Sequence, residues 1–516
     1  MSNVTRSIGG LTRVARLFSR MLGDGNPVLS FEVLSIMRLK TVKVVLIGLP
    51  LLLTMLVVAI AAASDSVGSR SAEAGGMILG LGVSAALYVV AVVGAVLGAQ
   101  AISSERQSGT LDLLLATGMT PVQIVVGKAM AVWIVLALML LACVPPLGIC
   151  FVSGGVSLGQ LVAAVVTVLV LSAVPVSLGV GLGAALKSAR LAVGSAVVAV
   201  GLVAPFVFSM LWMATLAAIG VDQTDGDWPF RFPAIVGHAG RFLVGGVVLP
   251  LYLVVMPSWL FLSMAVHALS SVATDRARPL RTWLVTMGPA GAVIAALLAA
   301  TVDLEDSGAL GVFGCLGTVL AAGTLALAAH PVPRRLPPGR AARTIGPNGD
   351  AVLCLVVTLA SLGLAAAFLW PFVGYHILLA GALVVTFVLC LAGSGVFFST
   401  LLRPWLARLA LFGLGVLVLL APLVAMVFVD ALGLAGSATG TEDLLVNLSP
   451  LGAYFQVAID AHNVIYTTEV NSIHSDAMPQ VSIVLWTILG VALWSVGAAR
   501  MQLEQEQQES SATTAA

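Results

Sequence analysis

The sequence predicts an all-α, polytopic membrane protein, and three observations lead to this prediction. Hydrophobic residues make up 59% of the 516-residue chain and charged residues only 9%, far below the roughly one quarter that soluble domains carry. Apolar runs of about 20 residues recur along the chain, and each is long enough to cross a hydrocarbon layer of roughly 30 Å as a helix. The basic residues gather in every second connection between these runs. Most of the protein surface is therefore expected to lie in a lipid bilayer.

The apolar runs predict about twelve membrane-spanning helices. The short connections near residues 155 and 375 also fit a re-entrant pair of helices in place of two full spans. Residues 1–40 are too polar for a secretory signal peptide. The predicted spans are 41–63, 76–102, 129–152, 158–186, 191–219, 242–272, 282–302, 309–330, 351–374, 376–398, 409–432 and 481–499.

The Lys and Arg residues predict the orientation of these spans. With the N-terminus placed inside, all but three of the 24 basic residues fall on the cytoplasmic side, and the exceptions are Arg70, Arg231 and Arg241. Insertion or deletion of one span near the middle would destroy this asymmetry, so it supports both an even number of spans and their direction. Both termini and residues 101–130 are therefore predicted to be cytoplasmic.

No residue pattern indicates an active site, a metal site or a nucleotide site. The histidines are scattered, and around Gly127 and Lys128 the chain has Val122 and Ala129 where a P-loop requires a glycine and a hydroxyl. The five cysteines lie inside predicted spans and lack the spacing of a zinc site or a disulfide framework. They are Cys143, Cys150, Cys315, Cys354 and Cys390. We therefore expect the chain itself to bind no cofactor.

The polar segment 101–130 predicts a short amphipathic helix between two spans. Gly109 allows a sharp change of direction, and Thr110 can cap the helix that follows. Leu111, Leu114 and Leu115 then share one helical face, at i, i+3, i+4 spacing.

The surroundings of these leucines fit a helix with defined ends. Asp112 places a negative charge near the positive N-terminal end, and Gly118 and Pro121 close the helix before Lys128 leads back to the membrane. An apolar helical face of this kind serves either to lie on a lipid surface or to dock in a groove of another protein.

The segment "SSERQSGTLDLLLATGMTPVQIVVGK", residues 103–128, resembles the hallmark of ABC-type-2 transporter permeases. In that family Glu-x-x-x-Gly-Thr-Leu-Glu/Asp-x-Leu-Leu-x-Thr leads through a Pro to a Gly-Lys that begins the third span. Two further pieces are similar to long bacterial members. "GNPVLSFEVLSIMRLK", residues 25–40, looks like the amphipathic helix before the first span, and "NLSPLGAYFQVAI", residues 447–459, looks like the external Ser-Pro segment before the last span.

The resemblance implies the membrane half of an ATP-driven exporter in the cell inner membrane. A separate cytoplasmic ABC ATPase subunit would bind the ATP, and a second permease copy or a homologous permease would complete the transporter. By position, Glu105, Arg106, Gly109 and Thr110 would form the beginning of the coupling helix. Leu111, Leu114 and Leu115 would form its docking face on the ATPase.

The chain departs from the family pattern in length, since typical members have six spans. The second half has no copy of the coupling motif, because "STLLRPWLAR", residues 399–408, lacks the Glu and the Gly-Thr. Either this half is a degenerate permease that makes a pseudo-dimer, or it is an accessory membrane domain and two whole chains pair. The predicted organisation is 1–40, cytoplasmic and amphipathic; 41–272, permease-like; 273–350, two spans and a basic linker; 351–499, a second membrane domain with an external loop at 433–480; and 500–516, a polar cytoplasmic tail.

The transported substrate is not predicted, since no charged ring or aromatic platform is visible in the spans. The basic linker 330–350 is expected near anionic lipid head groups, not on nucleic acid. An intramembrane enzyme, such as a transferase that acts on lipid-linked substrates, is the alternative to a permease. It would need catalytic carboxylates or a metal site facing one side of the membrane, and the acidic residues of this chain are sparse and scattered.

Overall fold

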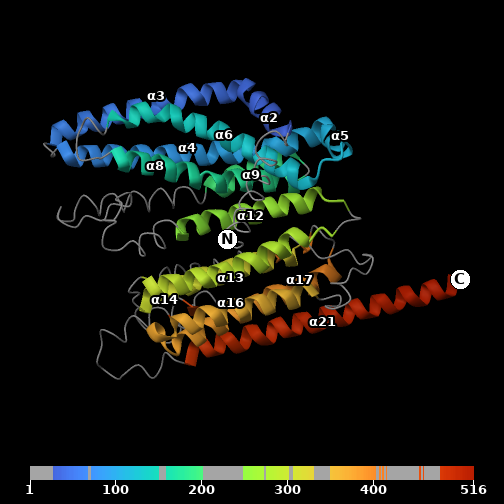
Figure 1. Ribbon diagram of the computed structural model, residues 1–516. Coiled ribbons are helices and arrows are strands. Elements are labelled where there is room, and N and C mark those ends of the chain that lie inside the picture. The colour runs from blue at the N-terminus through green and yellow to red at the C-terminus, as the bar shows by residue number, and fades with distance from the viewer. Residues whose placement is uncertain are drawn as a thin grey trace, which may run out of the picture. The chain divides into compact units, whose positions relative to one another are not determined.

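The computed structural model consists of helices that group into two compact units, each described here by itself (Figure 1). Unit 1 contains residues up to Phe242 together with Pro250–Ser270, and unit 2 contains Leu243–Leu249 and Ser271–Ala516. The residues described are 27–67, 71–149, 158–186, 188–201, 248–271, 275–301, 306–329, 349–402 and 477–515, with isolated positions between 406 and 457.

Unit 1 is arranged around the long helix α4, which packs against α3, α6, α8 and α9 (Figure 1). The short amphipathic helix α2 packs mainly on α6, and α5 packs on the end of α4. The helices of this unit are α2 (Pro27–Arg38), α3 (Lys40–Val67), α4 (Ser71–Ser108), α5 (Thr110–Ala116), α6 (Pro121–Leu147), α8 (Leu158–Leu171), α9 (Ala173–Ala185) and α12 (Leu249–Leu269).

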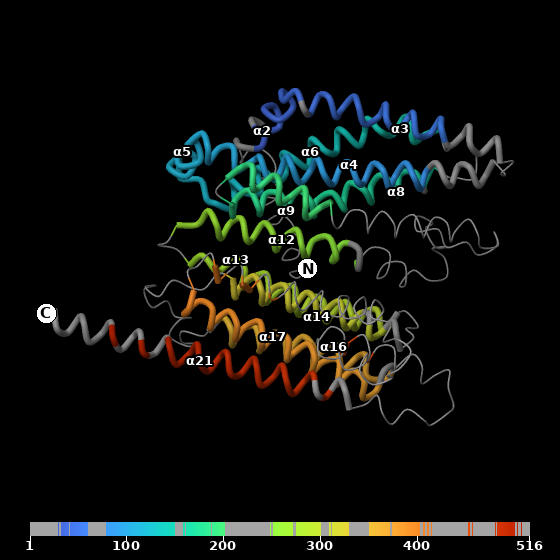
Figure 2. The backbone as a smooth tube through the Cα atoms, turned by 180° about the vertical axis from the view of Figure 1, so that it is seen from behind, coloured from blue at the N-terminus to red at the C-terminus, as the bar shows by residue number. Residues whose placement is uncertain are grey.

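Unit 2 contains α13 (Arg278–Thr301), α14 (Asp306–Ala328), α16 (Gly349–Val373), α17 (His376–Leu401) and α21 (Ala477–Ala515). Helices α17 and α21 lie side by side, as Figure 2 shows from behind. Their backbones meet at glycines, because a Cβ on Gly393 would lie 2.5 Å from the carbonyl oxygen of Gly490. The helices α13, α14, α16 and α17 pack on one another, so segments 273–350 and 351–499 contribute to the same unit.

The all-α, polytopic prediction is confirmed. Every element of the described residues is a helix, and nine helical segments among them are long and apolar enough to cross a membrane. Helices cover at least part of eleven of the twelve predicted spans, whereas 409–432 falls almost wholly outside the described residues. The same is true of the external loop 433–480, and all of 1–26 and of the linker up to 348 lie outside them. The total number of spans stays a prediction.

Several helix boundaries differ from the predicted ones. Helix α6 begins at Pro121, before the predicted start at 129, so Pro121 opens α6 and does not close the short helix before it. Helix α4 continues to Ser108, beyond the predicted end at 102, and α21 continues to Ala515, so the polar tail is helical. The predicted span 158–186 is divided at Ser172 into α8 and α9. Pro175 explains this division, because it has no N–H to donate to Leu171 and its ring clashes with that carbonyl group.

The predicted orientation can be tested with single cysteines in a cysteine-free background. Thr117, which is exposed after α5, is expected to be cytoplasmic, and Ser307, in the first turn of α14, is expected to be external. An impermeant thiol reagent added to intact cells should therefore label a cysteine at 307 and leave one at 117 unlabelled until the cells are opened. The reverse pattern would overturn the assigned orientation.

Candidate functional site

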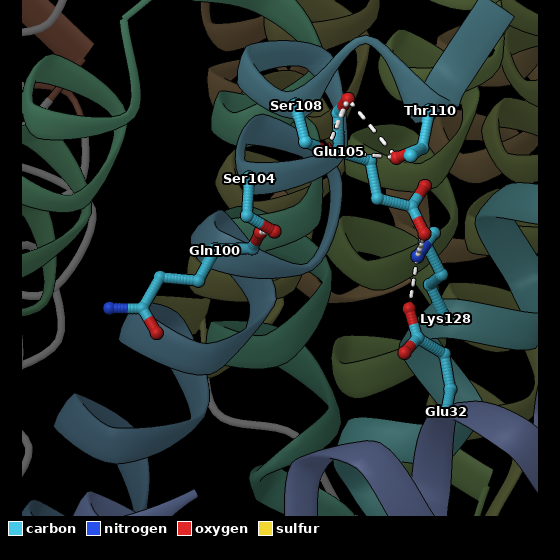
Figure 3. Close-up of polar contacts among 7 residues, drawn as sticks. All are labelled: Glu32, Gln100, Ser104, Glu105, Ser108, Thr110 and Lys128. Carbon is cyan, nitrogen blue, oxygen red and sulfur yellow. Dashed lines mark hydrogen bonds and ion pairs between the residues drawn. The ribbon is translucent and has the colours of Figure 1, made fainter.

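The junction between α4 and α5 is a tight turn at Gly109. Gly109 has φ 72°, in the left-handed region that favours glycine. The hydroxyls of Ser108 and Thr110 both donate to the carbonyl oxygen of Glu105, at 3.1 and 3.3 Å, and lie 2.9 Å from each other (Figure 3). These contacts cover one of the last carbonyl groups of α4, which have no partner within the helix.

The predicted capping role of Thr110 is therefore wrong. Gly109 is the N-cap of α5 and makes no side-chain cap, while Thr110 is the first residue of the helix. Its hydroxyl donates to a carbonyl group near the end of α4 and does not cap α5. The sequence does not distinguish the two arrangements, because a threonine after a glycine can hydrogen-bond either to the preceding helix or to the following one.

Helix α5 turns its predicted docking face partly inward. Leu111 is only 5% exposed and belongs to the hydrophobic core of unit 1, and Leu115 packs against that core. Leu114 is half-buried. By contrast, Leu113 is 68% exposed, and Asp112 beside it is also exposed. The apolar residue that α5 presents outward is thus Leu113, which the i, i+3, i+4 pattern does not include.

A second glycine turn and a capping box end the segment. Gly118 has φ 81°, and the Thr117 hydroxyl donates to the Leu114 carbonyl oxygen at 2.7 Å. Thr120 then caps α6 through a reciprocal pair of bonds with Gln123, next to Pro121 at the start of the helix. A Thr-x-x-Gln pattern before an apolar run is a known signal for a helix start, so this cap could have been found from the sequence.

Lys128 is completely buried between two carboxylates, which sequence reasoning missed. Its side chain is 0% exposed, and its Nζ lies 2.7 Å from Oε1 of Glu105 and forms an ion pair with Oε1 of Glu32 (Figure 3). The three residues, called the charge cluster below, come from α6, α4 and α2. Oε2 of Glu105 is buried and has no hydrogen-bond partner among the residues that the structure describes. The charge cluster thus joins the end of α4, just before the turn at Gly109, to two other helices.

Arg106 contacts the end of α9, whereas Glu105 contacts Lys128 on α6. Its guanidinium donates to the carbonyl oxygens of Ala184 at 2.7 Å and Leu186 at 2.8 Å. These carbonyl groups lie at the C-terminal end of α9, where a cation is favoured by the helix dipole and by the unpaired carbonyl groups. Adjacent side chains at the end of α4 therefore attach it to α6 and α2 on one side and to α9 on the other.

Close contact between α4 and α9 brings Arg106 to these carbonyl groups. A Cβ on Gly179 would lie 2.2 Å from the carbonyl oxygen of Ala95, and one on Gly183 would lie 2.4 Å from that of Ala99. Small residues spaced by four on each helix permit this approach, as in other membrane helix pairs. The four residues Ala95, Ala99, Gly179 and Gly183 make up the small-residue contact.

The arrangement can transmit a displacement of α5. The helix has seven residues, is held between two glycine turns, and is anchored by Leu111 in the core. Helix α5 is joined to α4 at Gly109, and the contacts of Glu105 and Arg106 connect the end of α4 to α2, α6 and α9, so a displacement of α5 would pass to these helices. Among the residues that the structure describes, no group of three or more His, Cys, Asp or Glu side chains could hold a metal ion.

Comparison with known proteins agrees with the resemblance of the 103–128 segment. Residues 41–229 match the family model described as "ABC-2 family transporter protein". This range includes α3 to α9, and therefore Glu105, Arg106, α5 and Lys128, but not Glu32 on α2. No curated protein and no solved structure matches the chain.

Proposed function

We propose that this chain, an ABC-2 type permease by its match over residues 41–229, exports its substrate across the inner membrane with energy from a separate cytoplasmic ATPase. The chain is the permease component of an ABC transporter and a multi-pass membrane protein. Binding and hydrolysis of ATP are assigned to the partner subunit. Pairing with a second permease copy stays a prediction, and the substrate is open.

The exposed side of α5 is the observation that carries this proposal. A short helix with a large exposed apolar residue, mounted between two glycine turns at the end of the second span, suits a groove on a cytoplasmic protein. The inward position of Leu111 makes the mounting rigid, because a displaced α5 would have to withdraw this side chain from the core. Leu113, and not the face of Leu111, Leu114 and Leu115, is therefore the proposed contact with the ATPase.

Movement of the ATPase would then reach the membrane helices by two routes. The first runs through Glu105 to Lys128 and Glu32, and the second through Arg106 to the end of α9. Both routes begin within one helical turn of Gly109. Displacement of α5 is thus expected to shift α2, α6 and α9 together with α4, which is the kind of rigid-body rearrangement that alternates access to a transport path.

Substitution of Leu113 by Asp should weaken association of the ATPase at least tenfold. Burial of one leucine in a protein groove contributes roughly 1.5–3 kcal/mol, and about 1.4 kcal/mol corresponds to tenfold in affinity. The fold should be preserved, because Leu113 is largely exposed in the isolated chain. The measurement is quantitative recovery of the P-loop ATPase with the tagged permease from detergent extract, normalised to total permease.

Leu503→Asp is the matched control, since Leu503 is 58% exposed on the polar end of α21, in the other unit. It should leave ATPase recovery unchanged. Equal recovery with Leu113→Asp and with the unmodified protein would exclude Leu113 as the docking contact and favour a lipid-surface role for α5.

A further inference from the structure

The corner between α2 and α3 carries a group of exposed basic residues. Arg38 ends α2, Leu39 joins the two helices, and Lys40 and Lys43 lie in the first turn of α3. All four side chains are exposed. No described residue forms an ion pair with any of the three cations. The charge cluster offers no compensation, because Glu32 is paired with Lys128.

Lys43 stands at the head of an apolar stripe on the outer surface of α3. Ile47, Leu51 and Met55 follow it at intervals of four residues, which places all four on one helical face. The three apolar side chains are 64%, 59% and 77% exposed. Since α3 is a candidate membrane span over Val42–Ala59, we expect this stripe to face acyl chains and Lys43, at the start of the span, to lie near the lipid head groups.

The row of residues beside this stripe has a gap between its side chains at Gly48, called the notch below. Val44, Gly48 and Leu52 form the adjacent row, in which the two large side chains are exposed and Gly48 has none. A Cβ added at Gly48 would meet nothing within 4 Å. The row is therefore hollowed at Gly48 on a surface that the rest of unit 1 does not cover.

Helix α2 adds an interfacial surface to the same corner. Leu29 and Ile36 are buried in the core of unit 1, while Leu34 is exposed one turn before Arg38. Exposed leucines next to cations at the membrane boundary are typical of helices that lie in the head-group region. Figure 1 shows α2 turned away from the axis of α3 at this corner.

We propose that this corner binds an anionic phospholipid. Arg38, Lys40 and Lys43 would contact the phosphate, and an acyl chain would lie along Ile47 and Leu51 beside the notch at Gly48. Charge complementarity identifies the occupant, because three basic residues lie within six positions of the sequence and no Asp or Glu occurs from Val33 to Ser64. The apolar stripe next to them favours a lipid over a soluble phosphate, because only a lipid has an acyl chain that can pack on these side chains.

Bound lipid would also hold one partner of the charge cluster in place. The helix that ends at Arg38 carries Glu32, which pairs with Lys128 on α6. A head group that clamps the end of α2 to the start of α3 therefore restricts movement of Glu32. The lipid site itself does not depend on the proposed function, since it rests only on the exposed surface of α2 and α3.

The test is lipid enrichment around the purified full-length chain. The protein is reconstituted in nanodiscs of phosphatidylcholine and phosphatidylglycerol at 3:1, and the lipids retained after transfer to detergent are identified by native mass spectrometry. The unmodified protein should retain phosphatidylglycerol selectively. The variant Arg38→Gln/Lys40→Gln/Lys43→Gln should lose this preference by roughly 100-fold in relative affinity, because each Lys or Arg near an anionic surface contributes about fivefold.

The control removes the same number of charges elsewhere. Arg190 and Arg278 are exposed at the start of other helices, and Arg500 is exposed within α21. The variant Arg190→Gln/Arg278→Gln/Arg500→Gln should retain the lipid as the unmodified protein does. Glycerol phosphate at the same concentration should not displace it, whereas displacement would show that the acyl chain contributes nothing and would overturn the lipid assignment. Unchanged enrichment in the α2–α3 variant, or an equal loss in the control, would also overturn the proposal.

A protein occupant gives a different result. If a second copy of the chain covered this corner, the unmodified protein would retain no phosphatidylglycerol in preference to phosphatidylcholine. Mass photometry would then show a dimer that the α2–α3 variant dissociates. That pair of results would assign the corner to an interface between chains and reject the lipid.

Discussion

Substitution of Lys128 by Met is expected to destabilise unit 1 by about 3 kcal/mol, because it leaves two carboxylates facing each other without a cation. Removal of one partner from a buried ion pair typically costs 3–5 kcal/mol. The lower end applies here, since Glu32 and Glu105 keep 13% and 22% of their side-chain surface exposed and water can reach them. The measurement is the free energy of unfolding in mixed detergent micelles, followed by tryptophan fluorescence.

Neutralising all three residues should recover most of this loss. In Lys128→Met/Glu32→Gln/Glu105→Gln the cluster contains no charge, and replacement of a whole buried ion group is often close to neutral. Lys40→Met, at an exposed position, should change stability by less than about 0.5 kcal/mol. A Lys128→Met protein as stable as the unmodified chain would show that the three side chains do not hold α2, α4 and α6 together.

The stability and the coupling role of the cluster can be separated. If the neutral triple variant folds and still binds the ATPase through Leu113, it lacks only the charged link between α4 and its neighbours. We then expect ATP hydrolysis by the complex to be decoupled from conformational change in the permease, since positions 105 and 128 no longer carry opposite charges.

The fold class was predictable because a bilayer imposes a simple rule on composition and length. Each span needs about 20 apolar residues with all backbone groups paired internally, and this requirement can be recognised from any stretch of sequence alone. The same holds for α5, whose ends are determined by Gly109 and Gly118. Local patterns of this kind involve neighbours in the chain and so need no knowledge of tertiary contacts.

The orientation of α5 was not predictable from its pattern. Helical periodicity places Leu111, Leu114 and Leu115 on one face, but does not show whether this face meets another protein, a lipid or the rest of the same chain. The structure places Leu111 in the core, so Leu113 becomes the outward residue. A hydrophobic helical face predicts that its side chains are buried, but it does not determine which surface buries them.

The charge cluster was missed for a related reason. Lys128 lies 96 positions from Glu32, and a lysine at the start of a span is ordinarily exposed to water or lipid head groups. Neither residue is unusual where it stands in the sequence. Only the packing of α2 on α6 brings them together, and no local signal near Lys128 predicts it.

Close packing of α4 and α9 gives the second large expected effect. Substitution of Gly179 by Leu should destabilise unit 1 by about 3 kcal/mol, the upper end of the usual cost of overpacking. Its Cβ alone would fall 2.2 Å from the carbonyl oxygen of Ala95, which is backbone and cannot rotate away. The two helices must therefore separate, and Arg106 would lose reach to the carbonyl groups of Ala184 and Leu186.

Gly194 provides a control in which the same substitution should have the opposite sign. A Cβ there meets nothing within 4 Å and the residue is exposed in the helix Ala189–Gly201. Gly194→Leu should therefore stabilise the protein slightly, by up to about 1 kcal/mol, through the better helix propensity of Leu. Both variants are compared by the free energy of unfolding in mixed micelles. The variant Arg106→Met is measured beside them, because it removes the hydrogen bonds from α4 to α9 but leaves the small-residue contact intact. If Gly179→Leu were no less stable than Gly194→Leu, α4 and α9 would not be in backbone contact, and Arg106 would have no fixed position from which to carry movement of α5 to α9.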